Sequence, residues 1–335
     1  MSSETARVHA ALITVSLIYG YFYVAVKLLL KTLTPPEFIL LRFILTAVVV
    51  LLIDRLFLKH PLPKGKDLLK IVGLGLIGVF VVQILVVVGL HNTTAFHSAL
   101  IMATIPIITL IFSIVSGRET FHFQKLMGII TGFAGVTVLL FFSSSPGTPL
   151  PPTYLMGDFI VLLNAVAFSW FLLGSQKMLQ KYQSFPFMAY CYIVSASLFS
   201  ALFFAGHLTV QHSLGLAFLA KITPSQWLSI AYVVLFASIG SYTLNNYALK
   251  RVSPSIVAIY MFIQPIISAA SGFYLLGEPF NSQMAIATTI TFAGVLMATT
   301  AGKKGFYLRQ TITPTETPEA IPMEKAANPA EPAEH

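Results

Sequence analysis

Residues 249–300, LKRVSPSIVAIYMFIQPIISAASGFYLLGEPFNSQMAIATTITFAGVLMATT, repeat residues 90–141, LHNTTAFHSALIMATIPIITLIFSIVSGRETFHFQKLMGIITGFAGVTVLLF, at a constant offset of 159 positions. Thirteen of the 52 aligned positions are identical, and they include the Pro-Ile-Ile run that begins at Pro106 and Pro265. The unit is much longer than the roughly 20–50 residues of a solenoid repeat. We therefore interpret the chain as two related halves.

The composition indicates a membrane protein. Of the 335 residues, 56% are hydrophobic and only 10% are charged, whereas a soluble domain has about 25% charged residues. Apolar stretches of about 20 residues, enough to cross a bilayer as a helix, recur along most of the sequence. Their apolarity is continuous rather than alternating, which excludes a transmembrane β-barrel. The fold class is therefore predicted to be an all-α polytopic membrane protein.

The charged residues and the cysteine content exclude several other classes. The net charge of +8 does not indicate nucleic-acid binding, because Lys and Arg gather at the ends of the apolar stretches. A single cysteine, Cys191, excludes a disulfide framework and a cysteine-based metal centre. The sequence has no zinc-protease motif, no phosphate loop and no paired intramembrane aspartates, so an enzyme, a metal and a cofactor are not expected.

The hydropathy pattern predicts ten transmembrane helices, mostly separated by short connections that contain proline. They cover residues 8–30, 36–57, 68–90, 95–116, 123–142, 155–178, 186–206, 225–248, 254–276 and 281–301. Residues 1–7 are expected to form a cytoplasmic N-terminus, 143–154 an external linker, and 303–335 a cytoplasmic, disordered tail. The two five-helix repeats are then 8–142 and 155–302.

The distribution of Lys and Arg predicts the orientation of these helices. With the N-terminus in the cytoplasm, the inner segments carry fifteen Lys or Arg residues before the tail's Lys325, and the outer segments carry only Lys31 and Lys221. Both termini of a cell (inner) membrane protein are therefore expected in the cytoplasm. Because each half has an odd number of spans, the two halves would have opposite orientations. Such inverted repeats are typical of secondary transporters that bind substrate near the membrane midplane.

Several short motifs occur in a recognisable order. They are Tyr19-Gly20, Lys27, Pro36, Arg42, Ser98-Ala99, Pro106, Gly117-Arg118-Glu119, Gly157-Asp158, Trp170, Asn246-Tyr247-Ala248-Leu249, Ser253-Pro254, Pro265 and Leu276-Gly277-Glu278. In their order, spacing and duplication the chain resembles the EamA-type permeases of the drug/metabolite transporter superfamily. The resemblance implies ten helices in inverted five-helix repeats and transport of small metabolites such as amino acids, drugs, sugars or nucleotide sugars. Tyr19 stands where the family usually has Trp, and Arg118 where Gly is commoner.

Polar and aromatic residues inside the predicted spans are the candidates for substrate binding, because polar groups in hydrocarbon are costly. They are Tyr19, Tyr23, Gln83, Asn164, Trp170, Tyr242, Asn246, Tyr260 and Gln264. Tyr242 and Asn246 share a helix face, and Gln83 is the repeat equivalent of Tyr242. Neutral donors and acceptors beside aromatic rings suit a polar or zwitterionic metabolite. The alternatives are interhelical hydrogen bonds for the amides, and packing or interfacial belts for the aromatic residues.

Two prolines and two basic residues in the spans have a second set of possible roles. Pro106 and Pro265 lie near the middle of spans four and nine, where each frees a backbone carbonyl, so they are predicted hinges of bent helices that line the cavity; simple packing kinks are the alternative. Lys27 and Arg42 lie near the outer ends of spans one and two. They would attract anionic substrate groups or, as we favour, extend to the lipid headgroups or pair with Glu37.

These features together predict a secondary transporter of small polar metabolites that works by alternating access. Amino acids or related compounds, exported, are the leading expectation. A carrier of sugars or nucleotide sugars is the alternative within the class, and a passive channel is the alternative outside it. The expected partners are a small-molecule substrate and membrane lipids, with the protein a monomer or homodimer. No Asp or Glu lies deep in a span, so weak or absent proton coupling is expected.

Overall fold

The computed structural model describes residues 3–58, 65–93, 95–143, 152–210, 215–276 and 282–300. In this part of the chain the regular structure is helical, with no strand. Most of the predicted linker and the whole predicted tail lie outside the described residues. The first half of the chain contains α1 (Ser3–Leu29), α2 (Pro35–Ile53) with the π-helical turn η1 (Asp54–Leu58), α3 (Lys66–Gly75), the π-helical segment η2 (Leu76–Val81), α4 (Val82–Asn92), α5 (Ala95–Met102), α6 (Ile105–Val115) and α7 (Phe123–Ser143).

The second half repeats this order of elements. It contains α8 (Pro152–Lys181), α9 (Ser184–Val210), a short 3-10 turn η3 (Ala217–Lys221), α10 (Pro224–Tyr232), the π-helical segment η4 (Val233–Gly240), α11 (Ser241–Leu249), α12 (Pro254–Ile259), the 3-10 turn η5 (Tyr260–Ile263), α13 (Gln264–Leu276) and α14 (Ser282–Thr300). Helical structure therefore lies in each of the ten predicted spans. The main difference is that four of those spans are interrupted by π-helical or 3-10 segments or by a turn.

Local sequence explains where the helices begin. Pro35 and Pro224 are first residues of α2 and α10, where the fixed φ of proline suits the helix and its missing N–H is not needed. The preceding threonine is hydrogen-bonded in each case: the Thr34 N–H donates to Glu37 over 2.7 Å, and the Thr223 N–H donates to Gln226 over 3.0 Å. These are capping arrangements that satisfy otherwise unpaired backbone groups.

The interruptions occur at equivalent places in the two halves. The π-helical segments η2 and η4 end at Val81 and Gly240, which are 159 residues apart. The helices α6 and α13 begin at Ile105 and Gln264, again 159 residues apart, and each has its proline at the second position. π-helical turns and proline both interrupt the regular hydrogen bonding of an α-helix. At these four places the backbone is therefore irregular inside a membrane span, which is tolerated where it is buried in protein or lines a cavity.

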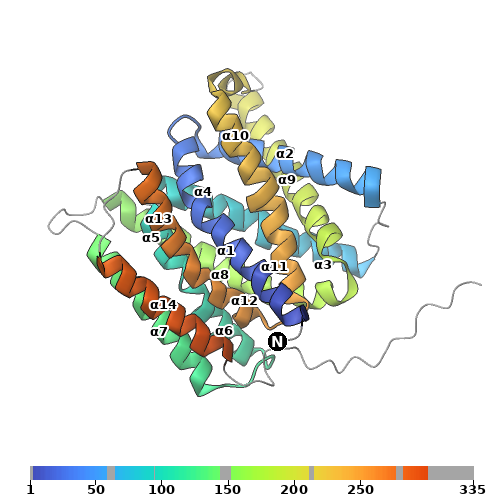
Figure 1. The fold of residues 1–335 in the computed structure, drawn as a ribbon. Coiled ribbons are helices and arrows are strands. Elements are labelled where there is room, and N and C mark those ends of the chain that lie inside the picture. The colour runs from blue at the N-terminus through green and yellow to red at the C-terminus, as the bar shows by residue number, and fades with distance from the viewer. Residues whose placement is uncertain are drawn as a thin grey trace, which may run out of the picture.

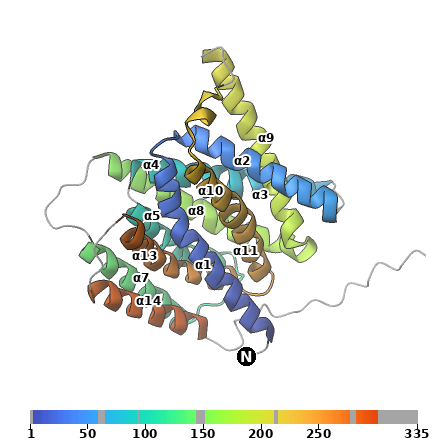
Figure 2. The same cartoon turned by 45° about the horizontal axis from the view of Figure 1, so that its top comes forward.

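Helices from the two halves pack against each other through small residues. α7 and α14, the last helices of the two halves, lie side by side (Figures 1 and 2). A Cβ on Gly294 would lie 2.2 Å from the Gly132 backbone nitrogen, and one on Gly128 would lie 2.4 Å from that of Ala298. Glycine is required at these contacts because the helix backbones approach so closely. The Gly128–Gly132 spacing thus serves packing within one chain.

The first helix holds a central position. α1 contacts α13 on one side and α11 on the other, and both neighbours belong to the second half (Figures 1 and 2). α4 packs against α8, and α2 packs against α9. The halves are therefore interleaved rather than placed end to end, and the interior between them is built from both.

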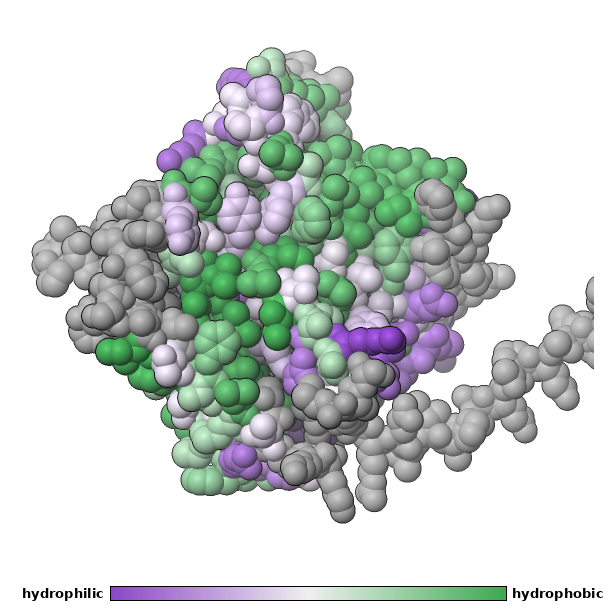
Figure 3. All heavy atoms as spheres, viewed as in Figure 1, coloured by the Kyte–Doolittle hydropathy of each residue, from purple (hydrophilic) through white to green (hydrophobic). Residues whose placement is uncertain are grey.

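The outer surface suits a bilayer. In the described part of the chain, seven helices are long and apolar enough to cross a membrane, and the apolar stretches Ile105–Val115 and Thr289–Ala298 are shorter. Hydrophobic residues cover much of the face in Figure 3, and the most hydrophilic ones lie toward its upper and lower parts. Large apolar side chains such as Leu52, Leu202 and Leu296 are more than half exposed. The fold is that of a polytopic α-helical membrane protein.

Candidate functional site

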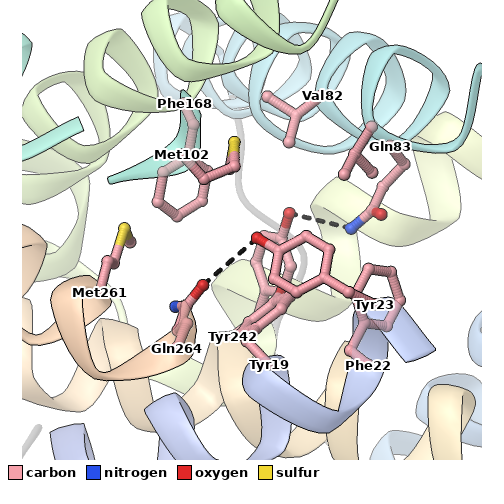
Figure 4. A pocket seen from close by; sticks show the side chains of 11 residues that line it. Tyr19, Phe22, Tyr23, Val82, Gln83, Met102, Phe168, Tyr242, Met261 and Gln264 are labelled. Carbon is pink, nitrogen blue, oxygen red and sulfur yellow. Dashed lines mark hydrogen bonds between the residues drawn. The ribbon is translucent and has the colours of Figure 1, made fainter. Parts of the chain in front are cut away.

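A small cavity lies in the interior between the two halves. The lining residues come from α1, α4, α5, α8, α11, η5 and α13: Tyr19, Phe22, Tyr23, Val82, Gln83, Val86, Met102, Phe168, Tyr242, Met261 and Gln264 (Figure 4). Both halves contribute polar groups to it. Five of the nine residues predicted to bind substrate are brought together here: Tyr19, Tyr23, Gln83, Tyr242 and Gln264.

The contact between Gln83 and Tyr242 has a geometric consequence. The Gln83 Nε2 donates to the Tyr242 hydroxyl over 3.0 Å, and that hydroxyl donates to the Gly78 carbonyl in η2 over 3.1 Å (Figure 4). Gln83 and Tyr242 are equivalent residues at the 159-residue offset. The contact therefore joins two repeat-equivalent side chains, one from each half, at the cavity wall.

A second hydrogen bond crosses the cavity from the first helix. The Tyr23 hydroxyl donates to the Gln264 side-chain oxygen over 3.3 Å, joining α1 to the first residue of α13 (Figure 4). Gln264 immediately precedes Pro265, so this polar group is presented where the helix is interrupted. Irregular backbone of this kind is tolerated in a membrane protein where it is buried in protein or lines a cavity.

The remaining wall is apolar and adaptable. Met102 and Met261, another pair of equivalent residues, line it together with Phe22 and Phe168. Methionine has an unbranched, polarizable side chain that fits ligands of irregular shape. The lining residues include no Asp, Glu, His, Lys or Arg. The wall as it stands therefore offers hydroxyls, amides, aromatic faces and thioethers.

The cavity in this conformation is small. Its volume is about 30 Å³, measured as the space open to the centres of water molecules. On this measure each water needs about 10–15 Å³. The cavity therefore has room for water rather than for a metabolite, and binding of a larger molecule requires parts of the wall to move.

Four of the nine predicted residues do not line the cavity. Asn164 is buried, and its amide donates to the Val82 carbonyl, so it supports the wall from behind. Asn246 is also buried, and Tyr260 bonds to His9 near the start of α1. Trp170 is 46% exposed on α8, because its position on the helix faces outward among apolar residues. It is not placed to meet a ligand in this cavity.

The expectation that Arg42 extends to the lipid headgroups is wrong, whereas Lys27 is only partly buried. The Lys27 Nζ donates to the Leu90 and Thr93 carbonyls over 2.8 and 2.7 Å, where it satisfies the C-terminal end of α4. Arg42 is only 1% exposed, and its Nε donates to the Ser238 hydroxyl in η4 over 2.9 Å. Both side chains turn inward because buried acceptors are available to them there.

Six of the eleven lining residues were not among the predicted substrate-binding residues: Phe22, Val82, Val86, Met102, Phe168 and Met261. Phe22, Val82, Val86 and Phe168 are apolar residues within apolar helices, so nothing marks them as different from lipid-facing neighbours. Sequence reasoning also missed Tyr192, whose hydroxyl accepts a 3.4 Å hydrogen bond from Gln83. A polar ring in the middle of a predicted span was an available signal for that residue.

A charged cluster joins the halves away from the cavity, at the turn between α6 and α7. Glu119 accepts hydrogen bonds from Lys125 and from Ser255, and the Lys125 Nζ donates to the Ser255 hydroxyl over 2.7 Å. Burial acts to raise the pKa of Glu119, but the charge and hydrogen bonds of Lys125 and Ser255 outweigh it and hold that pKa below its usual value. We refer to Glu119, Lys125 and Ser255 as the turn cluster.

A fold of interleaved apolar helices around a cavity between two halves defines a membrane protein of the transporter type. The chain belongs to the EamA-like transporter family, whose model matches it twice, over residues 7–141 and 155–300. An uncharacterized transporter of Archaeoglobus fulgidus is 26% identical over 89% of this chain and 98% of its own length. The uncharacterized inner membrane transporter YedA of Escherichia coli (strain K12) is 27% identical, over 91% of this chain and 94% of its own.

Two further comparisons agree with this assignment. The uncharacterized transporter YcxC of Bacillus subtilis (strain 168) is 25% identical over 81% of this chain and 85% of its own. A crystal structure with 18% sequence identity has the same fold, with a TM-score of 0.67 over 88% of this chain and 96% of the other. The protein is therefore a multi-pass membrane transporter, and the family consists of transporters rather than enzymes.

Proposed function

We propose that this protein is a secondary carrier of small polar metabolites that works by alternating access, with amino acids or related compounds, exported from the cytoplasm, as its substrates. The observation that carries this proposal is the Gln83–Tyr242 hydrogen bond, because it joins repeat-equivalent polar groups from the two halves at the cavity wall. In inverted repeats, a site between the halves is reached from either side by equivalent movements of the two halves.

The proposal includes the arrangement of the chain in the membrane. Ten helices form two inverted five-helix repeats, residues 8–142 and 155–302, with both termini in the cytoplasm and residues 143–154 outside. The equivalent interruptions before Ile105 and Gln264 support this arrangement, since an inverted repeat builds the same irregularity twice. Fusing a topology reporter after Ser145 tests it: an external signal is expected, and a cytoplasmic signal would rule out five spans in the first half.

The substrate site is proposed to consist of Tyr19, Tyr23, Gln83, Tyr242 and Gln264, with Pro106 and Pro265 as hinges. The five side chains supply hydroxyl and amide groups, and the neighbouring aromatic rings cover the apolar part of a ligand. Because the wall has no acid or histidine, we propose gradient-driven movement with proton coupling weak or absent.

Counterflow in proteoliposomes separates this proposal from its alternatives. Vesicles loaded with one unlabelled amino acid at high concentration are placed in a trace of the labelled compound, and a panel of amino acids and sugars is compared. A carrier accumulates label transiently and saturably, because its site must reorient with each cycle. A channel lets the label equilibrate without overshoot. Overshoot with sugars alone would favour the sugar carrier, and an imposed pH gradient that drives accumulation would refute weak coupling.

A further inference from the structure

Arg42 lies in the protein interior without an acidic partner. Its Nε bonds to the Ser238 hydroxyl, but Nη1 and Nη2 are buried and have no hydrogen-bond partner among the described residues. In the same part of the chain no Asp or Glu oxygen lies within 4.0 Å of it. The guanidinium carbon lies 4.8 Å from the centre of the Phe22 ring, a weak cation–π contact.

Such an arrangement is energetically expensive. A guanidinium stays charged at any physiological pH, so it cannot avoid the cost of burial by losing a proton. A buried charge is stable only when it is paired and its hydrogen bonds are made. Among the described residues the guanidinium has hydroxyl and aromatic neighbours but no acid, so its positive charge has no counter-charge there. A bound anion would supply that counter-charge.

The guanidinium is directly behind the cavity wall. Its neighbours include the hydroxyl of Tyr19, which lines the cavity, and the hydroxyl of Tyr192, which accepts a hydrogen bond from Gln83. Phe22, the ring beneath it, is also a lining residue. Since a metabolite needs more room than about 30 Å³, part of the wall must move on binding. Movement of Phe22 and Tyr19 would expose Nη1 and Nη2 to the ligand.

We propose that Arg42 binds a carboxylate of the transported substrate, so that the protein carries organic acids with a single carboxylate, zwitterionic amino acids included. This inference rests on the proposed transport function and narrows its substrate class. The two unsatisfied nitrogens form a planar fork that matches the two oxygens of a carboxylate. The hydroxyls of Tyr19 and Tyr192 are nearby donors for the same group.

The charge balance excludes the other ligand classes. A sugar would leave the buried cation uncompensated. A phosphate ester carries about −1.5 to −2 charges at pH 7, more than one arginine neutralises, and the cavity wall has no second cation. A monocarboxylate leaves the site neutral, which is the least costly state inside a membrane protein. A zwitterionic amino acid also pairs its carboxylate with Arg42, and its ammonium is then held by the hydroxyl and amide oxygens and the aromatic faces of the wall.

The test compares matched compounds on purified full-length protein in lipid nanodiscs. Thermal unfolding is measured with L-phenylalanine, 3-phenylpropionate, 3-phenylpropanamide and phenyl phosphate, and again with L-leucine and 4-methylpentanamide, since ligands stabilise by mass action. Counterflow is measured with the same compounds. The variants are Arg42→Gln, Arg42→Lys and the control Arg251→Gln, whose side chain lies at the protein surface against Glu4 and Tyr247. Monodispersity in size-exclusion chromatography shows which variants fold.

The inference predicts that carboxylates stabilise the wild type and Arg251→Gln, while the amides and phenyl phosphate do not. Arg42→Gln is expected to weaken carboxylate binding by about 10- to 100-fold, because a charged hydrogen-bonded pair is lost. Arg42→Lys keeps the charge but not the fork, and is expected to retain an intermediate affinity.

The outcomes separate this inference from the transport proposal. If carboxylates bind through Arg42 but show no counterflow, the carrier proposal fails and the carboxylate site stands. If no carboxylate stabilises the wild type, or if an amide binds and is transported equally well by the wild type and Arg42→Gln, the carboxylate site is wrong. Arg42→Lys provides the comparison if Arg42→Gln does not fold.

Discussion

Lys125 and Arg42 are both buried cations, but their surroundings differ completely. Lys125, 6% exposed, is paired with Glu119 and bonded to Ser255, so its charge and its donors are satisfied within the chain. Arg42, 1% exposed, has only hydroxyl groups and an aromatic ring as neighbours among the described residues, with no acid to balance its charge. The first arrangement holds the halves together at a turn. The charge of Arg42 has no counter-charge among the described residues, and Arg42 lies beside a cavity. Both features are expected of a side chain that binds an anionic ligand.

The largest expected difference is in the free energy of unfolding when Lys125 or Arg42 is replaced by methionine. Lys125→Met leaves Glu119 buried without its partner and is expected to destabilise the protein by about 3–5 kcal/mol. Arg42→Met removes a charge whose burial is uncompensated, so the free energy of unfolding is expected to stay unchanged or to rise. Reversible unfolding in mixed detergent micelles measures both. Equal destabilisation by the two substitutions would show that Arg42 has a structural partner after all.

Pro106 and Pro265 test whether the helices beside the cavity move during transport while the turn cluster stays fixed. Pro106→Ala and Pro265→Ala are expected to lower the counterflow rate on the order of tenfold, about 1.4 kcal/mol in the barrier, because they restore regular helix where a hinge is needed. Ligand binding followed by thermal shift should largely survive. If the double variant Pro106→Ala, Pro265→Ala shows a normal counterflow rate, the two prolines serve packing only and are not hinges.

Acid should affect the turn cluster before it affects the cavity. The pKa of Glu119 is held below its usual value in the folded protein, so its contribution to stability is complete above that usual value and is lost as the pH falls through the lowered one. We therefore expect the unfolding temperature to fall with pH in the wild type below about 4.5. The Glu119→Gln, Lys125→Met double variant should lose this part of the pH dependence. An unchanged profile would mean that other carboxylates govern acid stability.

The smallest expected effect concerns the hydrogen bond between Gln83 and Tyr242. Gln83→Leu, Tyr242→Phe and their combination form a double-mutant cycle, and the coupling energy for stability is expected to be about 0.6 kcal/mol, the average for a hydrogen bond between membrane helices. The effect on substrate affinity should be larger than this, because both groups face the ligand. If the coupling energy appears in stability but the substitutions leave substrate affinity unchanged, the Gln83–Tyr242 hydrogen bond is a structural contact only.

How much of this could be read from the sequence depends on the kind of signal. The 159-residue repeat marked the equivalent prolines and the Gln83–Tyr242 pair, and polar residues in apolar helices marked Tyr19, Tyr23 and Gln264, which all line the cavity. The apolar wall could not be predicted, because Phe22 and Val86 resemble the residues that face lipid. Trp170 was selected for its residue type, whereas its helix face points outward.

The buried position of Arg42 was not the favoured expectation from sequence, although attraction of anionic substrate groups was named as an alternative. Its position near a span end allowed its long side chain to reach either the headgroups or the interior, and sequence alone does not give the direction. The deciding group was Ser238, which lies in the π-helical segment η4 of the other half. Likewise, the positive charge of Lys125 appeared to be only a topology signal, although its partner Ser255 comes from 130 residues further along the chain.

The most direct test of the account is whether the equivalent methionines Met102 and Met261 line a path that opens to both sides. Met102→Cys and Met261→Cys are made separately in a Cys191→Ser background, with Leu202→Cys on the apolar outer surface as a control. A membrane-impermeant maleimide is applied to sealed vesicles of either orientation. Alternating access predicts that both cavity thiols react from each side, that a bound carboxylate slows them, and that Leu202→Cys does not react. Reaction of both cavity thiols from one side only, or from neither, would contradict a substrate path between the two halves.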